Sequence, residues 1–575
     1  MKKLLLILLC MPLLTLAQQT VGLFSNQPSS YNGYTLFNSL GSTNTYLIDN
    51  CGVKAYEWNS NFKPAAVVYL LDNGNLLRTN QLPNTTFSFG GTGGGIEILD
   101  PNSNVIWSYE VNSDSTLAHH DLEVLPNGNI LILAIELISA QEADTCGSLV
   151  SIDRYSEMIL EVNPSTSQIV WEWHAWDHLI QDTDSNLLCY GTISEHPKRI
   201  NINYAYDGTD PDWLHANSID YNANLDQIII NSPTFNELWI IDHSTTTAEA
   251  ADSIGGFSGN GGDILYRWGN PQAYNRGDTL DQTFEFQHDA HWIPSGLPDQ
   301  GKIMIFNNGN QRGYSSIDII DPPLDANNYI LTNNSTPYGP LNLHWSYSDS
   351  INFYSAFISG AQQLENGNIL ICSGAQGSIF EVEFQTDSVV WDYIIPMVGP
   401  NPIAQGDTVP PMGNICFRAQ KFSPSYSGFN NLVLIPTTVI ELNPLPSTCQ
   451  IYISGCTDSI ACNYDPLSNI NDGSCNYNST SYDTLVSAIN INWNSLTLNN
   501  SGDYSVTLIN SVGCDSIANI NFTLQLLGTH DIASSKVITL IRITDMLGKE
   551  AQYRRNTPLF YIYDDGTVEK RMVIE

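Results

Sequence analysis

The sequence has few basic residues: 21 Lys and Arg stand against 59 Asp and Glu, which gives a formal net charge of -38. Binding to nucleic acid needs a basic surface, so this chain is not expected to bind DNA or RNA. Long apolar runs are also missing after the N-terminal segment, and none approaches the ~18 residues that a transmembrane helix needs. We therefore expect no transmembrane segment in the mature chain.

The N-terminal segment, MKKLLLILLCMPLLTLAQQ, is the one pronounced apolar run. Two lysines, a short apolar stretch and a small residue at Ala17 are typical of a secretory signal peptide. We predict that residues 1–17 are removed and that the rest is exported through the periplasm, to be secreted or held at the cell surface. Ten cysteines follow Cys10, and an exported chain permits disulfides.

Sustained helical periodicity is lacking between residues 18 and 444, which excludes a mainly helical domain there. Short apolar runs joined by turn residues occur instead. In LPNGNILIL the Asn-Gly pair favours a tight hairpin loop. Related hairpins begin at Leu70, Tyr221, Pro298, Leu364 and Gly428.

Most of these hairpins are followed by a second pair of short strands, often ending on a tryptophan-centred strand such as VIWSYEV or IVWEWHA. Six such units at irregular spacings of roughly 55 to 95 residues predict an all-β fold, a six-bladed β-propeller with long loop insertions. An array of β-sandwiches is the alternative, but it would not explain the repeated tryptophan strand.

In a propeller the first strand of every blade lines the central channel, so equivalent positions converge on one axis. We aligned the first strands on their turns. The equivalent positions are then His120, His215, His288, Arg418, Ser359 and Ala66. Three histidines and an arginine are therefore expected to meet at the channel mouth, while strand alternation should turn at least one of the flanking residues His119 and His291 away from it.

Such a cluster permits several chemistries, because imidazoles ligate metals, attack electrophiles and transfer protons. A three-histidine zinc site is one interpretation, but the neighbouring Arg418 would repel a dication. A ring of histidines and an arginine is better suited to a dianionic group such as sulfate or phosphate, with one imidazole free to attack it.

Four segments carry a resemblance to a known family: LAHHDLEVLPNGN, DWLHANSIDYNANLDQIIINS, FEFQHDAHWIP with GKIMIFNNGNQR, and CFRAQ. Over residues 21–444 the chain resembles the bacterial arylsulfate sulfotransferases. That family consists of six-bladed periplasmic or secreted propellers that move sulfuryl groups between phenols without a nucleotide sulfate donor. The resemblance implies that His288 is the nucleophile sulfated on nitrogen, and that His120 and His215 bind the sulfuryl oxygens and assist the leaving phenolate.

One position departs from the family pattern. The arginine expected eighteen residues after the WLH histidine is Pro233 here, which can supply neither charge nor donor. We expect Arg418 to provide the missing cation in catalysis, with Arg312 as the second candidate. The alternative for Arg418 is a salt bridge to an acidic neighbour.

The function implied is transfer of a sulfuryl group from a phenolic sulfate ester to a phenol acceptor through a sulfohistidine, with no cofactor. A second hypothesis is a non-catalytic secreted propeller that binds ligands or serves in adhesion, which Pro233 and the C-terminal modules would favour. Two other motifs are weaker. The glycine run in FGGTGGGIEIL leads into a strand and not a helix, so it is not expected to cradle phosphate. In WHAWDH, a solvated loop is preferred to a metal site formed by His174, Asp177 and His178.

Three modules are predicted after a propeller of residues 18–447. Residues 448–477 are rich in cysteine, with spacing that suits disulfides, and their Asx residues suit either a structural calcium site or plain turns. The candidate oxygen ligands are Asp465, Asn469, Asn471 and Asp472. Residues 478–527 alternate like a small immunoglobulin-type sandwich. Residues 528–575 resemble the C-terminal sorting domain of type IX secretion, whose machinery would then be a partner.

Overall fold

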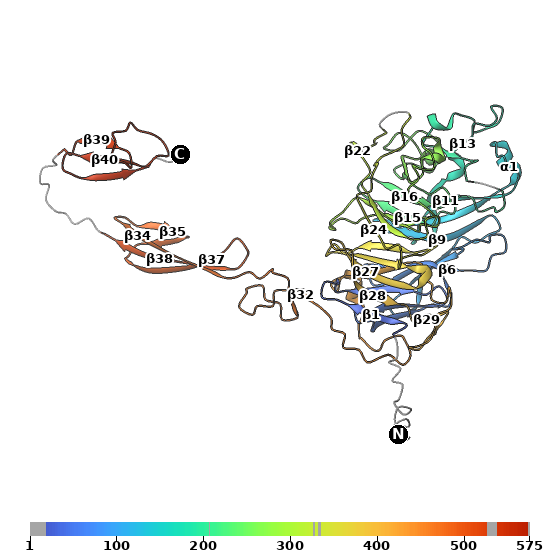
Figure 1. Cartoon of the computed structure of the whole chain (residues 1–575), viewed down its shortest axis with the longest axis horizontal. Helices are drawn as coiled ribbons and strands as arrows, with labels where there is room; N and C mark the ends of the chain where they lie inside the picture. Colours follow the sequence, from blue (N-terminus) through green and yellow to red (C-terminus); the bar gives the residue numbers. More distant parts are fainter. Residues whose placement is uncertain (1–18, 206–207, 326–327, 332–334, 526–536, 573–575) are drawn as a thin grey trace, which may run out of the picture. The chain divides into compact units, whose positions relative to one another are not determined.

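The computed structural model describes residues 19–205, 208–325, 328–331, 335–525 and 537–572, and the predicted signal peptide lies outside them. The chain divides into two compact units, residues 1–454 and 455–575. In both, β-strands are the main regular element (Figure 1). The helices are few, and they include α1 (Ala140–Thr145) and α2 (Thr247–Ala250). None of the helices in the described ranges is long and apolar enough to cross a membrane.

Six antiparallel sheets of four or five strands make up the first unit. In hydrogen-bonded order they are β5 (Pro64–Leu70), β6 (Leu76–Gln81), β7 (Gly94–Leu99), β8 (Val105–Glu110); β9 (Thr116–Val124), β10 (Ile130–Ile138), β11 (Arg154–Asn163), β12 (Gln168–His174); β15 (Ser218–Asn222), β16 (Gln227–Ser232), β17 (Glu237–Asp242), β18 (Tyr266–Trp268); β19 (His288–Trp292), β20 (Ile303–Asn307), β21 (Ser316–Ile320), β24 (Trp345–Ser348); β25 (Gly360–Gln363), β26 (Ile369–Ser373), β27 (Ser378–Glu383), β28 (Ser388–Ile394), β1 (Gly22–Asn26); and β31 (Ala419–Phe422), β2 (Tyr34–Asn38), β3 (Asn44–Ile48), β4 (Lys54–Asn59).

Short strand pairs occur in connections between the sheets and, in one case, in the loop between β21 and β24 of one sheet. They are β13 (Leu179–Ile180) with β14 (Ile200–Asn201), β22 (Leu324–Asp325) with β23 (Asn328–Tyr329) in that loop, and β29 (Met397–Val398) with β30 (Asn401–Pro402). The first of these pairs is parallel and the other two are antiparallel.

The hairpin turns predicted from the sequence are confirmed, except the one at Gly428. Between β9 and β10 the amide of Leu125 donates to the carbonyl of Asn129 over 2.9 Å, and that of Gly128 donates back to Leu125 over 2.8 Å. Gly128 has a φ of 84°, which only glycine adopts without strain. The same pattern recurs at Gly74 and Gly367, so each short apolar run is folded back onto its neighbour.

The first strands of the six sheets lie side by side in chain order. β5 contacts β9, and the contacts continue through β15, β19 and β25 to β31, whose partner β2 contacts β5. Side chains also bridge consecutive first strands. Asp121 accepts the Ile219 amide, the Ser218 hydroxyl accepts the Ala290 amide, and Asp289 accepts the Ala361 amide. The residues before and along these strands are therefore held close together.

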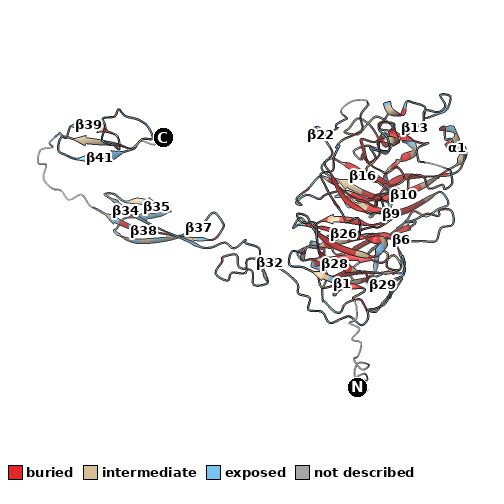
Figure 2. Ribbon diagram, in the orientation of Figure 1, coloured by how far each residue is buried: buried red, intermediate tan, exposed pale blue. Residues whose placement is uncertain are grey.

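The predicted tryptophan strand is the fourth strand of every sheet. The six carry Trp58, Trp107, Trp171 with Trp173, Trp268, Trp345 and Trp391. Several of these indoles are fully buried between sheets, where a large apolar ring removes the most surface from water. Figure 2 shows the buried strands gathered in the first unit.

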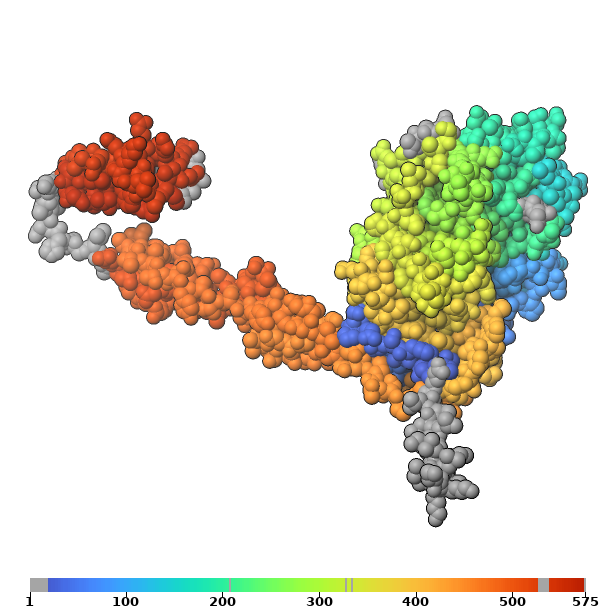
Figure 3. Space-filling model, in the orientation of Figure 1, coloured from blue at the N-terminus to red at the C-terminus, as the bar shows by residue number. Residues whose placement is uncertain are grey.

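One hairpin was predicted wrongly. The run GFNNLVLIPT begins with a 3₁₀ turn at Ser427–Asn431 and forms no strand after it. The sheet that starts with β31 is instead completed by β2, β3 and β4 from the beginning of the chain. The apolar run LVLIP was mistaken for a strand because its composition fits one. β1, by contrast, pairs with β28 as the fifth strand of its sheet. Figure 3 shows the blue N-terminal part of the chain at the surface of the first unit.

Two disulfides lie in the first unit, Cys51–Cys449 and Cys146–Cys189, and the free cysteines of the described residues, Cys372 and Cys416, are buried. Cys449, which the sequence placed with the cysteine-rich module, thus fastens the end of this unit to its beginning. Disulfides Cys456–Cys475 and Cys462–Cys514 belong to the second unit.

The second unit contains small sheets. β34 (Ser479–Ser487) pairs in parallel with β38 (Asp515–Leu524), which pairs with β37 (Gly502–Ile509), and β35 (Ile491–Trp493) forms a hairpin with β36 (Leu496–Leu498). A small core of Leu498, Ile520 and Phe522 joins them. β39 (Leu540–Thr544), β40 (Leu559–Tyr563) and β41 (Val568–Arg571) form a separate sheet, and β32 (Ser454–Gly455) pairs with β33 (Ile470–Asn471). The immunoglobulin-like and sorting-domain assignments stay predictions.

Candidate active site

The three histidines predicted to converge lie in or just before neighbouring first strands. His120 is within β9, His215 precedes β15 and His288 begins β19. The rings of His120 and His215 are in edge contact, with centroids 5.0 Å apart. Phe417 packs against His120 at 5.8 Å and against His288 at 6.3 Å. The structure therefore brings the buried His120 and His288 and the partly buried His215 into one cluster, which we call the histidine cluster.

Irregular backbone turns these side chains out of the regular strand alternation. His120, His215 and Asp289 have φ angles of 47°, 51° and 56°, values rare for residues with a Cβ. The pairing register shifts at the same place in β9 and in β19. Bulges of this kind re-aim side chains near functional sites.

A carboxylate and a second histidine support His120. Its Nδ1 lies 2.8 Å from Nδ1 of His119, whose Nε2 lies 2.9 Å from the Glu157 carboxylate. His119, which sequence reasoning set aside, therefore connects His120 to a buried acid. Burial, and then the neighbouring His215, lower the pKa of His120 well below its ordinary value, so this imidazole is neutral near pH 7.

His215 has the opposite electrostatic environment. Its Nδ1 lies 2.5 Å from the Asp212 carboxylate. Burial disfavours the charged imidazole, but the hydrogen bond and charge of Asp212 outweigh it and raise the pKa of His215 above its ordinary value. The protonated form of this histidine is therefore stabilised beside two neutral ones.

His288 is held by contacts at both ring nitrogens. Nδ1 faces Oδ1 of Asn308 at 2.8 Å and the carbonyl of Phe286 at 3.2 Å, and both are acceptors. The proton must therefore be on Nδ1, and the lone pair on Nε2. The amide of Ile358 donates to this Nε2 over 3.1 Å. Burial lowers the pKa of His288 to about 3, which keeps the ring neutral.

Asn308 also positions the peptide that faces His288. Its Nδ2 donates to the carbonyls of Ser355 and Ile358 over 2.7 and 3.0 Å. Ile358 and Ser359 have φ angles of 51° and 95°, and for a β-branched residue such as isoleucine this is a true outlier. Strained backbone that surroundings hold in place is concentrated at functional sites.

The glycine run of FGGTGGGIEIL covers the histidine cluster. The Phe89 ring lies 5.5, 6.3 and 5.9 Å from those of His119, His120 and His215. The carbonyl of Gly91 accepts the His120 amide over 3.0 Å. A Cβ on Gly91 would overlap the His120 ring, so only glycine fits against it.

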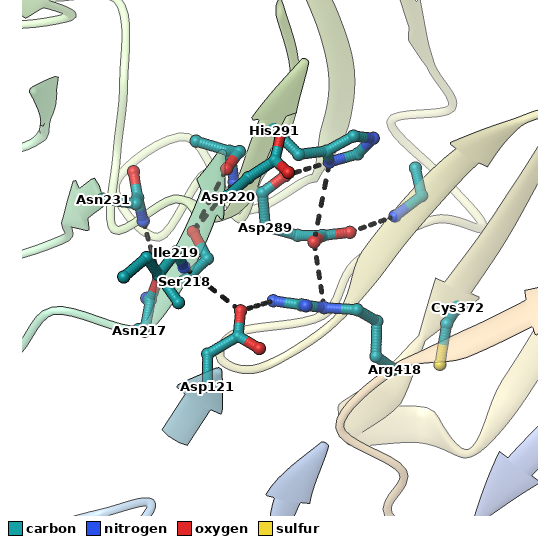
Figure 4. Close-up of polar contacts among 12 residues, drawn as sticks. Asp121, Asn217, Ser218, Ile219, Asp220, Asn231, Asp289, His291, Cys372 and Arg418 are labelled. Atoms are coloured by element: carbon teal, nitrogen blue, oxygen red, sulfur yellow. Dashed lines mark hydrogen bonds and ion pairs between the residues drawn. The ribbon is translucent and has the colours of Figure 1, made fainter. Parts of the chain in front are cut away.

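Arg418 lies in an ion-pair network next to the histidine cluster (Figure 4). Its Nη2 is 3.0 Å from Asp121 and its Nε is 2.9 Å from Asp289, while Nη1 donates to Tyr69 over 2.7 Å. These two acids directly follow His120 and His288 in the chain. The salt bridge that the sequence left open as the alternative is therefore formed, and a direct catalytic role of Arg418 stays a prediction.

Pro233 and Arg312, the other two positions considered for the expected cation, do not supply a positive charge to the histidine cluster. Pro233 lies between β16 and β17, where its carbonyl accepts the Asn236 amide in a turn. The Arg312 side chain is bound to Ser316 and to the Tyr314 carbonyl.

The remaining sequence candidates are paired within the protein. The solvated loop predicted at WHAWDH is wrong, because Ala175–His178 form a 3₁₀ turn in which His178 is buried. His174 pairs with Glu136, and His178 with Asp263 and the Ala250 carbonyl. Among the residues described, no group of three or more His, Cys, Asp and Glu side chains is arranged to hold a metal. In the cysteine-rich module Asp465, Asn471 and Asp472 each accept nearby backbone amides, as Asx turns do. The calcium site stays a prediction.

Sequence reasoning found the histidines but missed the residues that hold them. Glu157, Asp212, Asn308, Ile358 and Phe89 were not singled out. Asp212, in DWLH, stands three residues before His215, so the sequence alone could have indicated this pair. Asn308 stands in GKIMIFNNGNQR and Phe89 in FGGTGGGIEIL, but neither was given a role. Glu157 and Ile358 are distant in sequence and carry no motif of their own.

Comparison with known proteins places the chain in a family. The family described as "Arylsulfotransferase (ASST)" matches residues 23–395, more than half of the chain. The chain belongs to the arylsulfotransferase family. The three histidines lie within the matched residues, whereas Arg418 lies beyond them. No curated protein matches the chain significantly.

Solved structures match the chain only at low similarity. A protein of unknown function from Bacteroides caccae is 11% identical, with 68% of this chain and 99% of that chain covered and a TM-score of 0.38. An inactive virginiamycin B lyase from Staphylococcus aureus is 9% identical, with 66% and 89% covered and a TM-score of 0.30. The Dos1 propeller is 11% identical, with 69% and 80% covered and a TM-score of 0.28. No argument rests on likenesses this weak.

Proposed function

We propose that this arylsulfotransferase moves a sulfuryl group from a phenolic sulfate ester to a phenol through a sulfohistidine at His288. The observation that carries the proposal is the setting of this imidazole. It is neutral, its proton is committed to Asn308, and its lone pair is on Nε2, where it accepts the Ile358 amide. A neutral, oriented imidazole is a competent nucleophile.

In the first half-reaction Nε2 of His288 attacks sulfur, and the bond between sulfur and the phenolic oxygen breaks. The electron pair leaves with the phenolate, which takes the proton of His215. Asp212 favours that protonated state of His215 before the reaction. Neighbouring groups with pKa values pushed apart are the usual mark of a nucleophile paired with an acid.

In the second half-reaction a phenol replaces the first one. Neutral His215 takes its proton as the phenolic oxygen attacks sulfur, the N–S bond breaks, and the lone pair returns to His288. The Ile358 amide, which donates to Nε2 in the empty site, would then face the sulfuryl oxygens as a fixed donor. His120, supported by His119 and Glu157, completes the binding of the group.

Arg418 is assigned a positioning role in this proposal. It holds Asp121 and Asp289, the residues that follow two of the three histidines, and so fixes β9 and β19 relative to each other. With Pro233 in place of the family arginine, protonated His215 is the cation that offsets charge on the departing phenolate.

The proposal extends to architecture and location. We infer that the six sheets are the blades of a six-bladed propeller, because their first strands follow one another and β2 closes the set by pairing with β31. We also propose export, which four disulfides support, and sorting by the type IX machinery through the sheet of β39, β40 and β41. A purely adhesive role is less favoured, because the family match includes all three histidines.

The direct test is release of 4-nitrophenol from 4-nitrophenyl sulfate by the purified chain, with and without an added phenol. We expect release to depend on the acceptor, and incubation with donor alone to add one sulfuryl group to the peptide that contains His288. Absence of both product and modified peptide would refute the proposal.

A further inference from the structure

A cavity of about 740 Å³ lies further along the first strands than the histidine cluster. Its walls include residues that follow the clustered positions in chain order: Glu123 in β9, Asp220 in β15, His291 in β19, Gln362 in β25 and Gln420 in β31. Arg418 and Asp289 also line it, so the ion-pair network separates it from His288. This volume is typical of a small-molecule site.

Carboxylates predominate over cations in this cavity. The charge of Arg418 is matched by Asp121 and Asp289, which lie within 3.0 Å of it. His291, in contact with the Asp289 carbonyl at 2.9 Å, adds one further cation when protonated. Glu123 and Asp220 have no arginine or lysine of their own in the cavity wall, and Asp72 lines the same space. The cavity wall therefore has more acidic than basic side chains.

Aromatic rings form another part of the wall. Tyr69, Trp292, Phe422 and Tyr426 line the cavity together with Leu125 and two prolines. A cation is attracted to the face of such rings, and an apolar body packs against them. Carboxylates beside aromatic rings are the pattern that recognises an ammonium group carried on an apolar frame.

We propose that this cavity binds a small organic cation, a primary amine with an aromatic or apolar body. Such a ligand places its ammonium between Glu123 and Asp220 and its body against Trp292 and the tyrosines. A bare metal ion fits less well, because no metal-binding group of side chains occurs among the described residues. The proposal is independent of sulfuryl transfer.

The ionisable side chains of the cavity predict how ligand binding depends on pH. Burial and the nearby acids raise the pKa of Glu123, and burial raises the pKa of Asp220 to about 6. Burial disfavours the charged form of His291, but the negative charges of Asp289 and Asp220 outweigh this effect, so the pKa of His291 is raised as well. Asp289 stays charged because Arg418 lowers its pKa despite burial. As the pH rises through 6 the cavity gains negative charge, so a bound ammonium is held more tightly and its binding releases protons.

Calorimetry on the full chain tests this with benzylamine and its neutral counterpart benzyl alcohol. We expect benzylamine to bind, benzyl alcohol to bind at least ~10-fold more weakly, and benzylamine affinity to rise on the order of tenfold from pH 5 to pH 7.5. Equal affinity for the two compounds, or benzylamine affinity that does not change with pH, would overturn the proposal.

Variants assign the effect to the cavity. Glu123→Gln and Asp220→Asn should each weaken benzylamine binding ~10-fold or more, whereas Asp182→Asn, which removes an exposed carboxylate outside the cavity, should not. In Asp220→Asn the side-chain oxygen can still accept the hydrogen bond that the Trp292 amide donates to Asp220 over 2.7 Å in the native chain. If either cavity variant fails to fold, the comparison of the two compounds on the native chain decides. Unchanged binding by both folded variants would also overturn it.

Discussion

The amide of Ile358 donates a hydrogen bond to Nε2 of His288 over 3.1 Å. A residue with a strained positive φ thus presents its only backbone donor to the nitrogen that we propose as the nucleophile. This hydrogen bond engages the lone pair, so the proposed attack requires a substrate to displace it. The same N–H then remains beside the reacting group.

Replacement of His288 by Asn should abolish transfer. Asparagine has about the right size and polarity but no nucleophilic nitrogen, so we expect turnover of 4-nitrophenyl sulfate to fall by ~10³-fold or more. Circular dichroism should show an unchanged fold. His196→Asn, at an exposed histidine, is the matched control. Turnover retained in the folded variant would exclude His288 as the nucleophile.

Asn308→Asp should slow the reaction because it disturbs the position of the Ile358 peptide beside His288, and not because it weakens substrate binding. The new carboxylate can still accept from Nδ1 of His288 but loses the two donors that hold the Ser355 and Ile358 carbonyls. We expect kcat to fall about 10- to 100-fold, as loss of an orienting contact does, with KM little changed. The rate of sulfohistidine formation in a single turnover measures this. Asn186→Asp, in an exposed loop, is the control, and an unchanged kcat would contradict the assignment.

Asp212→Asn should move the alkaline limb of the pH profile to lower pH. Asp212 raises the pKa of His215, so the general acid stays protonated to higher pH in the native chain and is lost as pH rises through that value. Phenyl sulfate, whose phenolate needs the proton, should show the shift more strongly than 4-nitrophenyl sulfate. The measurement is kcat/KM against pH, with Asp114→Asn as control. A limb that stays in place would exclude His215 as the acid.

Gly91→Ala should disrupt the histidine cluster. An added methyl group overlaps the His120 ring, and the φ of 81° adds backbone strain of ~1 kcal/mol. Gly301→Ala separates the two effects, because Gly301 has the same φ and nothing near its Cβ position. We expect both variants to lose stability in thermal unfolding but only Gly91→Ala to lose most of its activity. Equal activity of the two variants would show that the glycine loop does not cover the site.

Deletion of the chain from Leu547 onward should retain the protein in the periplasm, because it removes β40 and β41 of the predicted sorting domain. Deletion of residues 478–527, which leaves that sheet in place, is the control and should still be sorted. Immunoblots of the fractions measure the outcome. Appearance of the tail-truncated chain outside the cell would show the sorting assignment wrong.

Local signals were sufficient for much of the fold. Asn-Gly turns and recurring tryptophans marked the strands correctly, and a shared register brought His120, His215 and His288 together in advance. The shared register could not predict, however, which partners each side chain would contact. Arg418 occupies the same register, but Asp121 and Asp289 draw its guanidinium into ion pairs. Nor could it reveal Asn308, Ile358 or Glu157, because their contacts depend on loops and bulges that no local pattern encodes.

The seam between β2 and β31 joins parts of the chain that are synthesised far apart. β2 emerges early, but its partner β31 follows only after the five other sheets have been made. Until then β2 presents an unpaired edge, which readily recruits other chains. Folding of the first unit therefore cannot proceed to completion from the N-terminus as synthesis goes on. Fragments that stop before Ala419 should therefore aggregate, because they leave this edge of β2 without its partner.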